Sequence, residues 1–99
     1  QPSKQEIQKF EDYIMEEFTK KRYLSDIKNH EYMLSNIFKS MVVENYYDDQ
    51  KQLPIDKFAY DFFQNTNHTY RGAFTVDSEE VKLNEQQMNK SLSKIDSKD

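Results

Sequence analysis

Residues 54–63 read Pro-Ile-Asp-Lys-Phe-Ala-Tyr-Asp-Phe-Phe, and this stretch decides the fold class. Its apolar side chains recur at i, i+3, i+4, i+7 and i+8, which is the spacing of one face of an α-helix. These are Ile55, Phe58, Ala59, Phe62 and Phe63. Pro54 suits the first helical turn, where its missing N–H needs no partner. We therefore predict a helix over 54–65, ended by a turn at the polar run 65–68, which places His68 in that turn.

A second helix is predicted at the start of the chain. Ser3 followed by Glu6 matches a capping box, in which each side chain bonds the backbone N–H of the other residue. The apolar residues behind it are spaced by three or four positions and form one stripe: Ile7, Phe10, Ile14 and Phe18. Lys20, Lys21 and Arg22 suit the negative end of the helix dipole. The pattern predicts a helix over 4–22.

A third helix is predicted between these two, over 26–47, with Ser25 or Asp26 as its cap. Its apolar stripe is broad and comprises Ile27, Leu34, Ile37, Phe38, Met41 and Val42, widened by Met33, Val43 and Tyr46. A helix that is apolar over so much of its circumference is typical of a buried position. We therefore expect this helix to be the central one, and Asn29-His30 to be the point where a late start would fall.

The C-terminal segment allows two interpretations. Asp77 and Glu80 match a second capping box, and a sparse apolar seam (Val81, Met88, Leu92 and Ile95) then favours a helix over 78–95. In the alternative, residues 70–76 alternate like a strand and pair with 81–83, which gives a short hairpin at 70–83 in an α+β fold. Because the seam is sparse, we expect this segment to be loosely attached, with 96–99 frayed.

Length and composition fit a single small helical domain over residues 1–99. The chain is 35% hydrophobic and 32% charged, with no Cys and one Gly. The absence of Cys excludes disulfides and a thiol nucleophile, and a single Gly excludes a glycine-rich phosphate loop. No apolar run is long enough to span a bilayer. The surplus of Lys, Asn, Ile, Phe and Tyr over Gly, Ala, Arg and Pro indicates an AT-rich genome, such as that of a low-GC bacterium or a mobile element.

The sequence offers no catalytic or metal-binding constellation. His30 and His68 are its two histidines, and neither has a second strong ligand three or four positions away, as zinc sites usually require. The segment that starts at Asp48 joins two predicted helices and has Ile55 at its eighth position, as a calcium-binding loop would. Leu53 and Ala59, however, stand where such a loop needs Gly and Glu. We expect no enzyme activity, no metal and no cofactor.

Nucleic-acid binding is disfavoured by charge. The chain has a net charge of −4, whereas sequence-independent binding needs a basic stripe that releases counterions. Its one basic cluster, Lys20-Lys21-Arg22, follows Glu16 and Glu17, so that Glu16 with Lys20 and Glu17 with Lys21 fall at i, i+4. We expect a salt-bridged helix end here, with phosphate contact as the alternative.

Tyrosine is the residue type that exceeds the needs of a minimal core. The chain has seven Tyr and seven Phe, and several Tyr fall beside the predicted stripes. Tyr is favoured at interfaces because it buries a rigid ring and keeps a polar tip. We predict an acidic, aromatic docking patch composed of Tyr46, Tyr47, Asp48, Asp49, Tyr60 and Asp61. In the alternative interpretation, these rings only cover a thin core.

The leading functional hypothesis is a non-enzymatic protein–protein interaction module. Because the chain opens on Gln1-Pro2-Ser3 without Met, we expect a removed leader and an exported or lipid-anchored bacterial protein; contact with a membrane would then come through that missing anchor. The alternatives are a cytoplasmic inhibitor or immunity protein of a phage or mobile element, and a helical nucleic-acid-binding domain.

Overall fold

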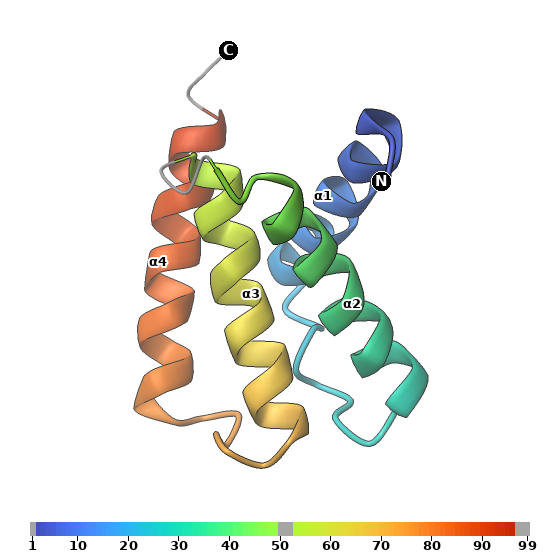
Figure 1. Cartoon of the computed structure of the whole chain (residues 1–99). Helices are drawn as coiled ribbons and strands as arrows, with labels where there is room; N and C mark the ends of the chain where they lie inside the picture. Colours follow the sequence, from blue (N-terminus) through green and yellow to red (C-terminus); the bar gives the residue numbers. More distant parts are fainter. Residues whose placement is uncertain (1, 50–52, 97–99) are drawn as a thin grey trace.

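The protein is a bundle of four α-helices (Figure 1). A computed structural model describes residues 2–49 and 53–96, and no strand occurs in these ranges. The helices are α1 (Lys4–Thr19), α2 (His30–Tyr46), α3 (Pro54–Tyr70) and α4 (Glu79–Asp96). The all-α prediction, with three core helices and a C-terminal helix, is confirmed. The alternative hairpin at 70–83 does not form.

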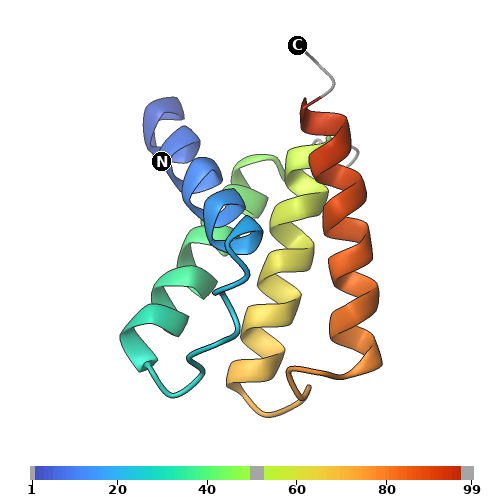
Figure 2. The ribbon, with the colours of Figure 1, turned by 180° about the vertical axis from the view of Figure 1, so that it is seen from behind.

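The central helix of the bundle is α3. It lies between α2 and α4, and α1 crosses behind them, so that α3 contacts all three other helices (Figures 1 and 2). The prediction that 26–47 forms the central helix is therefore wrong. The prediction for the apolar face of α3 is correct at its centre, because Phe58, Ala59 and Phe62 have no exposed surface.

Aromatic rings form the middle of the core. Phe18 of α1 meets Phe58 of α3 edge to face, with ring centroids 5.5 Å apart. The ring of Tyr23 stacks on Phe62 at 5.1 Å. Val43 and Met88 add apolar surface from α2 and α4. Complete burial of such side chains stabilises a fold by about 1.5–3 kcal/mol each.

The first helix is shorter than the predicted 4–22. The capping box of Ser3 and Glu6 forms as predicted, but the helix ends at Thr19 because Lys21 takes a left-handed backbone conformation, with φ of 58°. The N–H groups of Lys21 and Arg22 then bond the carbonyls of Phe18 (3.0 Å) and Glu17 (3.3 Å). This is the Schellman arrangement, which satisfies the last helical carbonyls.

The second helix begins at His30 and not at 26. Asn29 is its N-cap, and the Asn29 side chain accepts a hydrogen bond from the N–H of Tyr32 at 3.1 Å. Ser25 and Asp26, the predicted caps, lie in the preceding connection. This connection stays non-helical and inserts Tyr23 into the core, where 3% of its surface is exposed.

The third helix runs to Tyr70, well beyond the predicted end at 65. The polar run that predicted a turn is helical, and its side chains find partners both in the bundle and in the helix itself. Asn65 Nδ2 donates to the Tyr23 hydroxyl (3.1 Å) and to the Val81 carbonyl (3.2 Å). The hydroxyls of Thr66 and Thr69 donate to the carbonyls of Phe62 (2.8 Å) and Asn65 (2.6 Å). His68 therefore lies in the last turn of α3 and not in a loop.

The fourth helix matches the predicted 78–95 within one residue at each end. Its cap differs, because the hydroxyl of Ser78, and not the Asp77 carboxylate, accepts the N–H of Val81 at 3.3 Å. The helix packs along the length of α3 and buries Val81, Met88 and Ser91. The expectation of a loosely attached C-terminal segment is therefore wrong. Of the predicted frayed residues, Asp96 ends α4 and 97–99 lie outside the described residues.

Candidate functional site

The predicted docking patch does not form one continuous hollow. Tyr46, Asp48, Asp49 and Tyr60 are exposed, but Tyr46 lines a small depression with Pro2, Val42 and Asn45. Tyr47 turns toward α1, and its hydroxyl donates to the Glu11 carboxylate at 2.6 Å.

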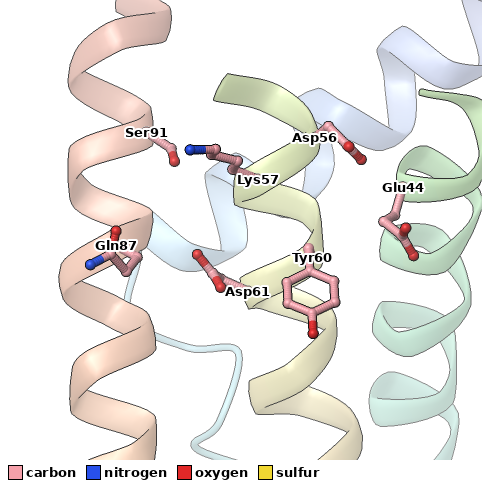
Figure 3. A pocket seen from close by; sticks show the side chains of 7 residues that line it. All are labelled: Glu44, Asp56, Lys57, Tyr60, Asp61, Gln87 and Ser91. Atoms are coloured by element: carbon pink, nitrogen blue, oxygen red, sulfur yellow. The ribbon is translucent and has the colours of Figure 1, made fainter. Parts of the chain in front are cut away.

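The other two residues of the patch, Tyr60 and Asp61, line a separate hollow on the front of α3. Its volume is about 460 Å³. It is lined by Glu44 from α2, by Asp56, Lys57, Tyr60 and Asp61 from α3, and by Gln87 and Ser91 from α4 (Figure 3). We call it the acidic hollow, because three of its residues are carboxylates. In Figure 3 the Asp61 side chain lies between α3 and α4, whereas Tyr60 lies on the side of α3 nearer to α2.

The electrostatics of the acidic hollow centre on Asp61. Burial raises the pKa of this carboxyl from 3.8 to about 6, and the nearby Lys57 ammonium opposes the shift. At neutral pH the group is mostly ionised, in a place where water stabilises it poorly. The hollow therefore favours a ligand that brings a positive charge.

Each histidine ring makes a polar contact through Nδ1. His30 Nδ1 lies 2.6 Å from the Tyr70 hydroxyl, and His68 Nδ1 lies 2.9 Å from the Gln64 carbonyl oxygen of its own helix. Within residues 2–49 and 53–96, no group of three or more His, Asp or Glu side chains is placed to hold a metal ion.

Most tyrosines join the helices to one another through polar contacts. The hydroxyl of Tyr32 donates to Glu17 at 2.7 Å, and the hydroxyl of Tyr23 donates to Glu85 at 2.5 Å. Burial, and then the hydrogen bond to the carboxylate, raises the pKa of Tyr32 to about 12 and that of Tyr23 further. These phenols stay protonated at any physiological pH. Much of the tyrosine surplus therefore has a structural role that the sequence pattern did not reveal.

The basic cluster at the end of α1 is partly paired, as predicted. Lys20 Nζ lies 2.8 Å from the Glu16 carboxylate. The predicted pair of Glu17 with Lys21 is wrong, because the left-handed turn at Lys21 redirects the chain, and Glu17 instead lies 3.4 Å from Arg22.

The largest departure from the sequence prediction is the orientation of α2. Leu34 and Phe38, expected in the core, are each 52% exposed, and Met41 is 37% exposed. We call these three residues the outward face of α2. The opposite side of the helix is buried and contains Met33, Asn36, Ser40 and Val43. Of the exposed large apolar side chains in the described chain, four of seven belong to α2.

Polar partners hold α2 in this orientation. The buried Asn36 accepts a hydrogen bond from the Tyr13 hydroxyl of α1 at 2.7 Å. Ser40 donates to the carbonyl of Asn36 at 2.9 Å, so its hydroxyl is satisfied within the helix. Met33, Asn36, Ser40 and Val43 follow the helical spacing i, i+3, i+7, i+10 in the sequence. Because two of these four residues are polar, the spacing did not indicate a buried side.

The comparisons with known proteins add no family. No protein-family model, no curated protein and no solved structure matches this chain. None of the described helices combines the length and apolar character that crossing a membrane requires. The outward face of α2 and the acidic hollow are the two surface features of the described chain that bear on function.

Proposed function

We propose that the protein is a non-enzymatic protein–protein interaction module, and that the outward face of α2 is its principal contact surface. The observation that carries the proposal is the exposure of Leu34, Phe38 and Met41 on one side of one helix. Contiguous apolar surface of this kind on a folded chain marks interaction sites. The partner is a protein that presents an apolar stripe to this face.

The spacing of these residues supports a helical mode of recognition. Leu34, Phe38 and Met41 follow i, i+4, i+7, the arrangement by which one helix places its anchors against another. Phe38 is backed by Phe10 of α1, with ring centroids 6.4 Å apart. An aromatic anchor that is already fixed by a neighbouring ring loses little freedom when a partner covers it.

The predicted patch residues fit the same proposal as flanking contacts. Tyr46, Asp48 and Asp49 lie at the C-terminal end of α2, and Tyr60 and Asp61 lie in the acidic hollow beside it. Tyr47, which bonds Glu11, takes a supporting role in this proposal. Export from a low-GC bacterium remains a hypothesis about the setting of the interaction.

Site-specific photo-crosslinking tests the proposal. A photoreactive phenylalanine replaces Phe38, and the control carries the same group at Leu83, which is 59% exposed on α4. After irradiation in an extract of the source cells, we expect a discrete crosslinked protein from position 38 and none from position 83, with the crosslinked peptides identified by mass spectrometry. Identical product patterns from both positions would contradict the proposal.

A further inference from the structure

Acidic side chains border the outward face of α2. Glu31 is exposed in the first turn of the helix, and Asp48 and Asp49 are exposed just beyond its last residue. Glu44 lies one turn beyond Met41 and lines the acidic hollow. The apolar residues are thus flanked by carboxylates at both ends of the helix and along the side that faces α3.

Lysines compensate this charge only in part. Residues 26–49 contain five acidic residues and two lysines: Asp26, Glu31, Glu44, Asp48 and Asp49 against Lys28 and Lys39. The Lys39 ammonium lies 3.9 Å from the centre of the Tyr13 ring on the α1 side. Lys57 in the acidic hollow extends toward Ser91 of α4 and away from Glu44 (Figure 3). The side between α2 and α3 therefore remains negative.

We propose that the outward face of α2 binds a basic amphipathic helix of a partner protein. The apolar side of that helix packs on Leu34, Phe38 and Met41. Its Lys or Arg side chains lie over the carboxylates of Glu31, Glu44 and Asp48. This inference rests on the proposed function and adds the chemistry of the partner.

The dimensions of α2 suit such a partner. Its 17 residues rise by about 1.5 Å each, which gives a contact line of about 25 Å, or between four and five turns. Basic groups that reach sideways from the partner toward α3 meet Glu44, the α2 residue that lines the acidic hollow.

A second copy of this chain is a poorer occupant. Each copy carries a net charge of −4 and would bring the same acidic border to the interface. Juxtaposed like charges suppress association. A basic partner removes that repulsion and replaces it with attraction.

The test uses two synthetic peptides and the ¹⁵N-labelled full chain. Both peptides have about 18 residues, to match the helix length, and the same leucine stripe; one carries Lys on its polar side and the other carries Glu. We expect the Lys peptide to shift the amide resonances of residues 31–48. We expect the Glu peptide to bind at least about ten-fold more weakly. Binding of the Lys peptide should weaken when salt rises from about 50 to about 500 mM, because exposed charges are then screened.

Two pairs of variants locate the contact. Leu34→Ser with Phe38→Ser removes the apolar anchors, and we expect affinity for the Lys peptide to fall at least about ten-fold. Glu44→Gln with Asp48→Asn removes two rim charges, and we expect a loss of about three-fold or more and a weaker salt dependence. The control Glu79→Gln with Glu80→Gln, at the start of α4, removes the same charge elsewhere and leaves affinity unchanged.

The outcomes separate this inference from the proposed function. If both peptides bind equally well at residues 31–48, the inference of a basic partner is overturned, whereas the proposed function as an interaction module is still supported. Shifts confined to other helices, or none, would overturn the inference, and a failed crosslink at position 38 would then also remove the proposed function. Concentration-dependent shifts of α2 with dimers in sedimentation would assign the face to a second copy and overturn the inference.

Discussion

The helices α2 and α3 have the same length but opposite relations between sequence and burial. Both contain 17 residues. In α3 the apolar residues Phe58 and Phe62 are fully buried, whereas in α2 the apolar Leu34 and Phe38 are exposed and the polar Asn36 is fully buried. Both helices bury polar residues, Asn65 and Thr66 in α3 as well as Asn36 in α2. The comparison therefore shows that apolar spacing identifies the buried side only where large apolar rings dominate it, as Phe58 and Phe62 do in α3.

The physical difference lies in what each buried polar group meets. On the inner side of α2 the Tyr13 hydroxyl donates to Asn36 Oδ1 and Ser40 donates to a helix carbonyl, while Asn36 Nδ2 is buried with no hydrogen-bond partner among the described residues. A hydrogen-bonded polar group costs little to bury, while an unsatisfied one costs about 1–3 kcal/mol. The side of α2 that faces the bundle can therefore contain these two polar residues. The outward face of α2, with its larger apolar side chains, remains available to another molecule.

The strongest test of the comparison is truncation of one ring on each helix. Phe62→Ala removes a fully buried ring that stacks on Tyr23, and we expect a loss of about 3–5 kcal/mol in the free energy of unfolding. Phe38→Ala on α2 should cost less than about 1 kcal/mol, as surface substitutions do. Urea unfolding followed by circular dichroism measures both. Similar losses for the two variants would mean that α2 does not face outward as described.

The polar interior of α2 gives the second test. Asn36→Leu leaves the Tyr13 hydroxyl without its acceptor, and we expect a loss of about 1–3 kcal/mol. Adding Tyr13→Phe removes the stranded hydroxyl and should recover part of that loss, so the two changes are not additive in a double-mutant cycle. Strictly additive effects in urea unfolding would show that the bond between these residues does not hold the helix.

Helix ends extend the comparison to a third pair of sites. The left-handed residue that follows α3 is Gly72, with φ of 80°, and the one that follows α1 is Lys21, with φ of 58°, in the same hydrogen-bonded arrangement. Left-handed backbone costs a non-glycine residue about 1–2 kcal/mol. We expect Lys21→Gly to raise the free energy of unfolding by about 1 kcal/mol and Gly72→Ala to lower it by a similar amount. Thermal unfolding of both variants checks the signs, and a destabilised Lys21→Gly variant would contradict the argument.

The smallest expected effect concerns Asp61 on α3, where an acidic residue is half-buried. Its pKa is raised by burial to about 6 in the folded protein, so folding favours the protonated form. That stabilisation is complete below the ordinary pKa of 3.8 and is lost as pH rises through about 6. Asp61→Asn should therefore raise the free energy of unfolding at pH 7 by up to about 1 kcal/mol, after allowance for solvent screening.

The control for this prediction is the pH dependence itself. Near pH 4 both the variant and the parent chain carry an uncharged group at this position, so the advantage should shrink toward zero. Urea unfolding at the two pH values provides the measurement. If Asp61→Asn raises the free energy of unfolding equally at pH 7 and near pH 4, the effect comes from packing and not from charge.

Local signals predicted the elements of the fold better than their ends. The capping box at Ser3 and the proline at 54 mark the starts of α1 and α3 as predicted. The end of α1, the start of α2 and the end of α3 all differ from the prediction. The left-handed backbone at Lys21 ends α1, the Asn29 cap starts α2, and Thr hydroxyls that bond carbonyls of their own helix accompany the extension of α3. The apolar spacing marks none of these boundaries.

The candidate site was predicted in part. Tyr46, Tyr60, Asp48 and Asp49 are exposed as a docking patch would require, and binding to a partner stays a prediction. Tyr47 bonds Glu11, which no sequence spacing indicates because the two residues lie on different helices. The outward face of α2 was missed, since its residues were assigned to the core on periodicity alone.

Local sequence signals are enough to predict that the chain is helical, where most of its helices lie and which side of α3 faces the core. These features follow from capping, from the backbone limits of proline and from apolar spacing, and all of these act within a few turns. The tertiary structure alone decided the orientation of α2, the central place of α3 and the role of the tyrosines. The pairs Tyr13–Asn36 and Tyr23–Glu85 join residues 23 and 62 positions apart. Which face of a helix is buried depends on the groups that meet it, and only the folded chain brings those groups together.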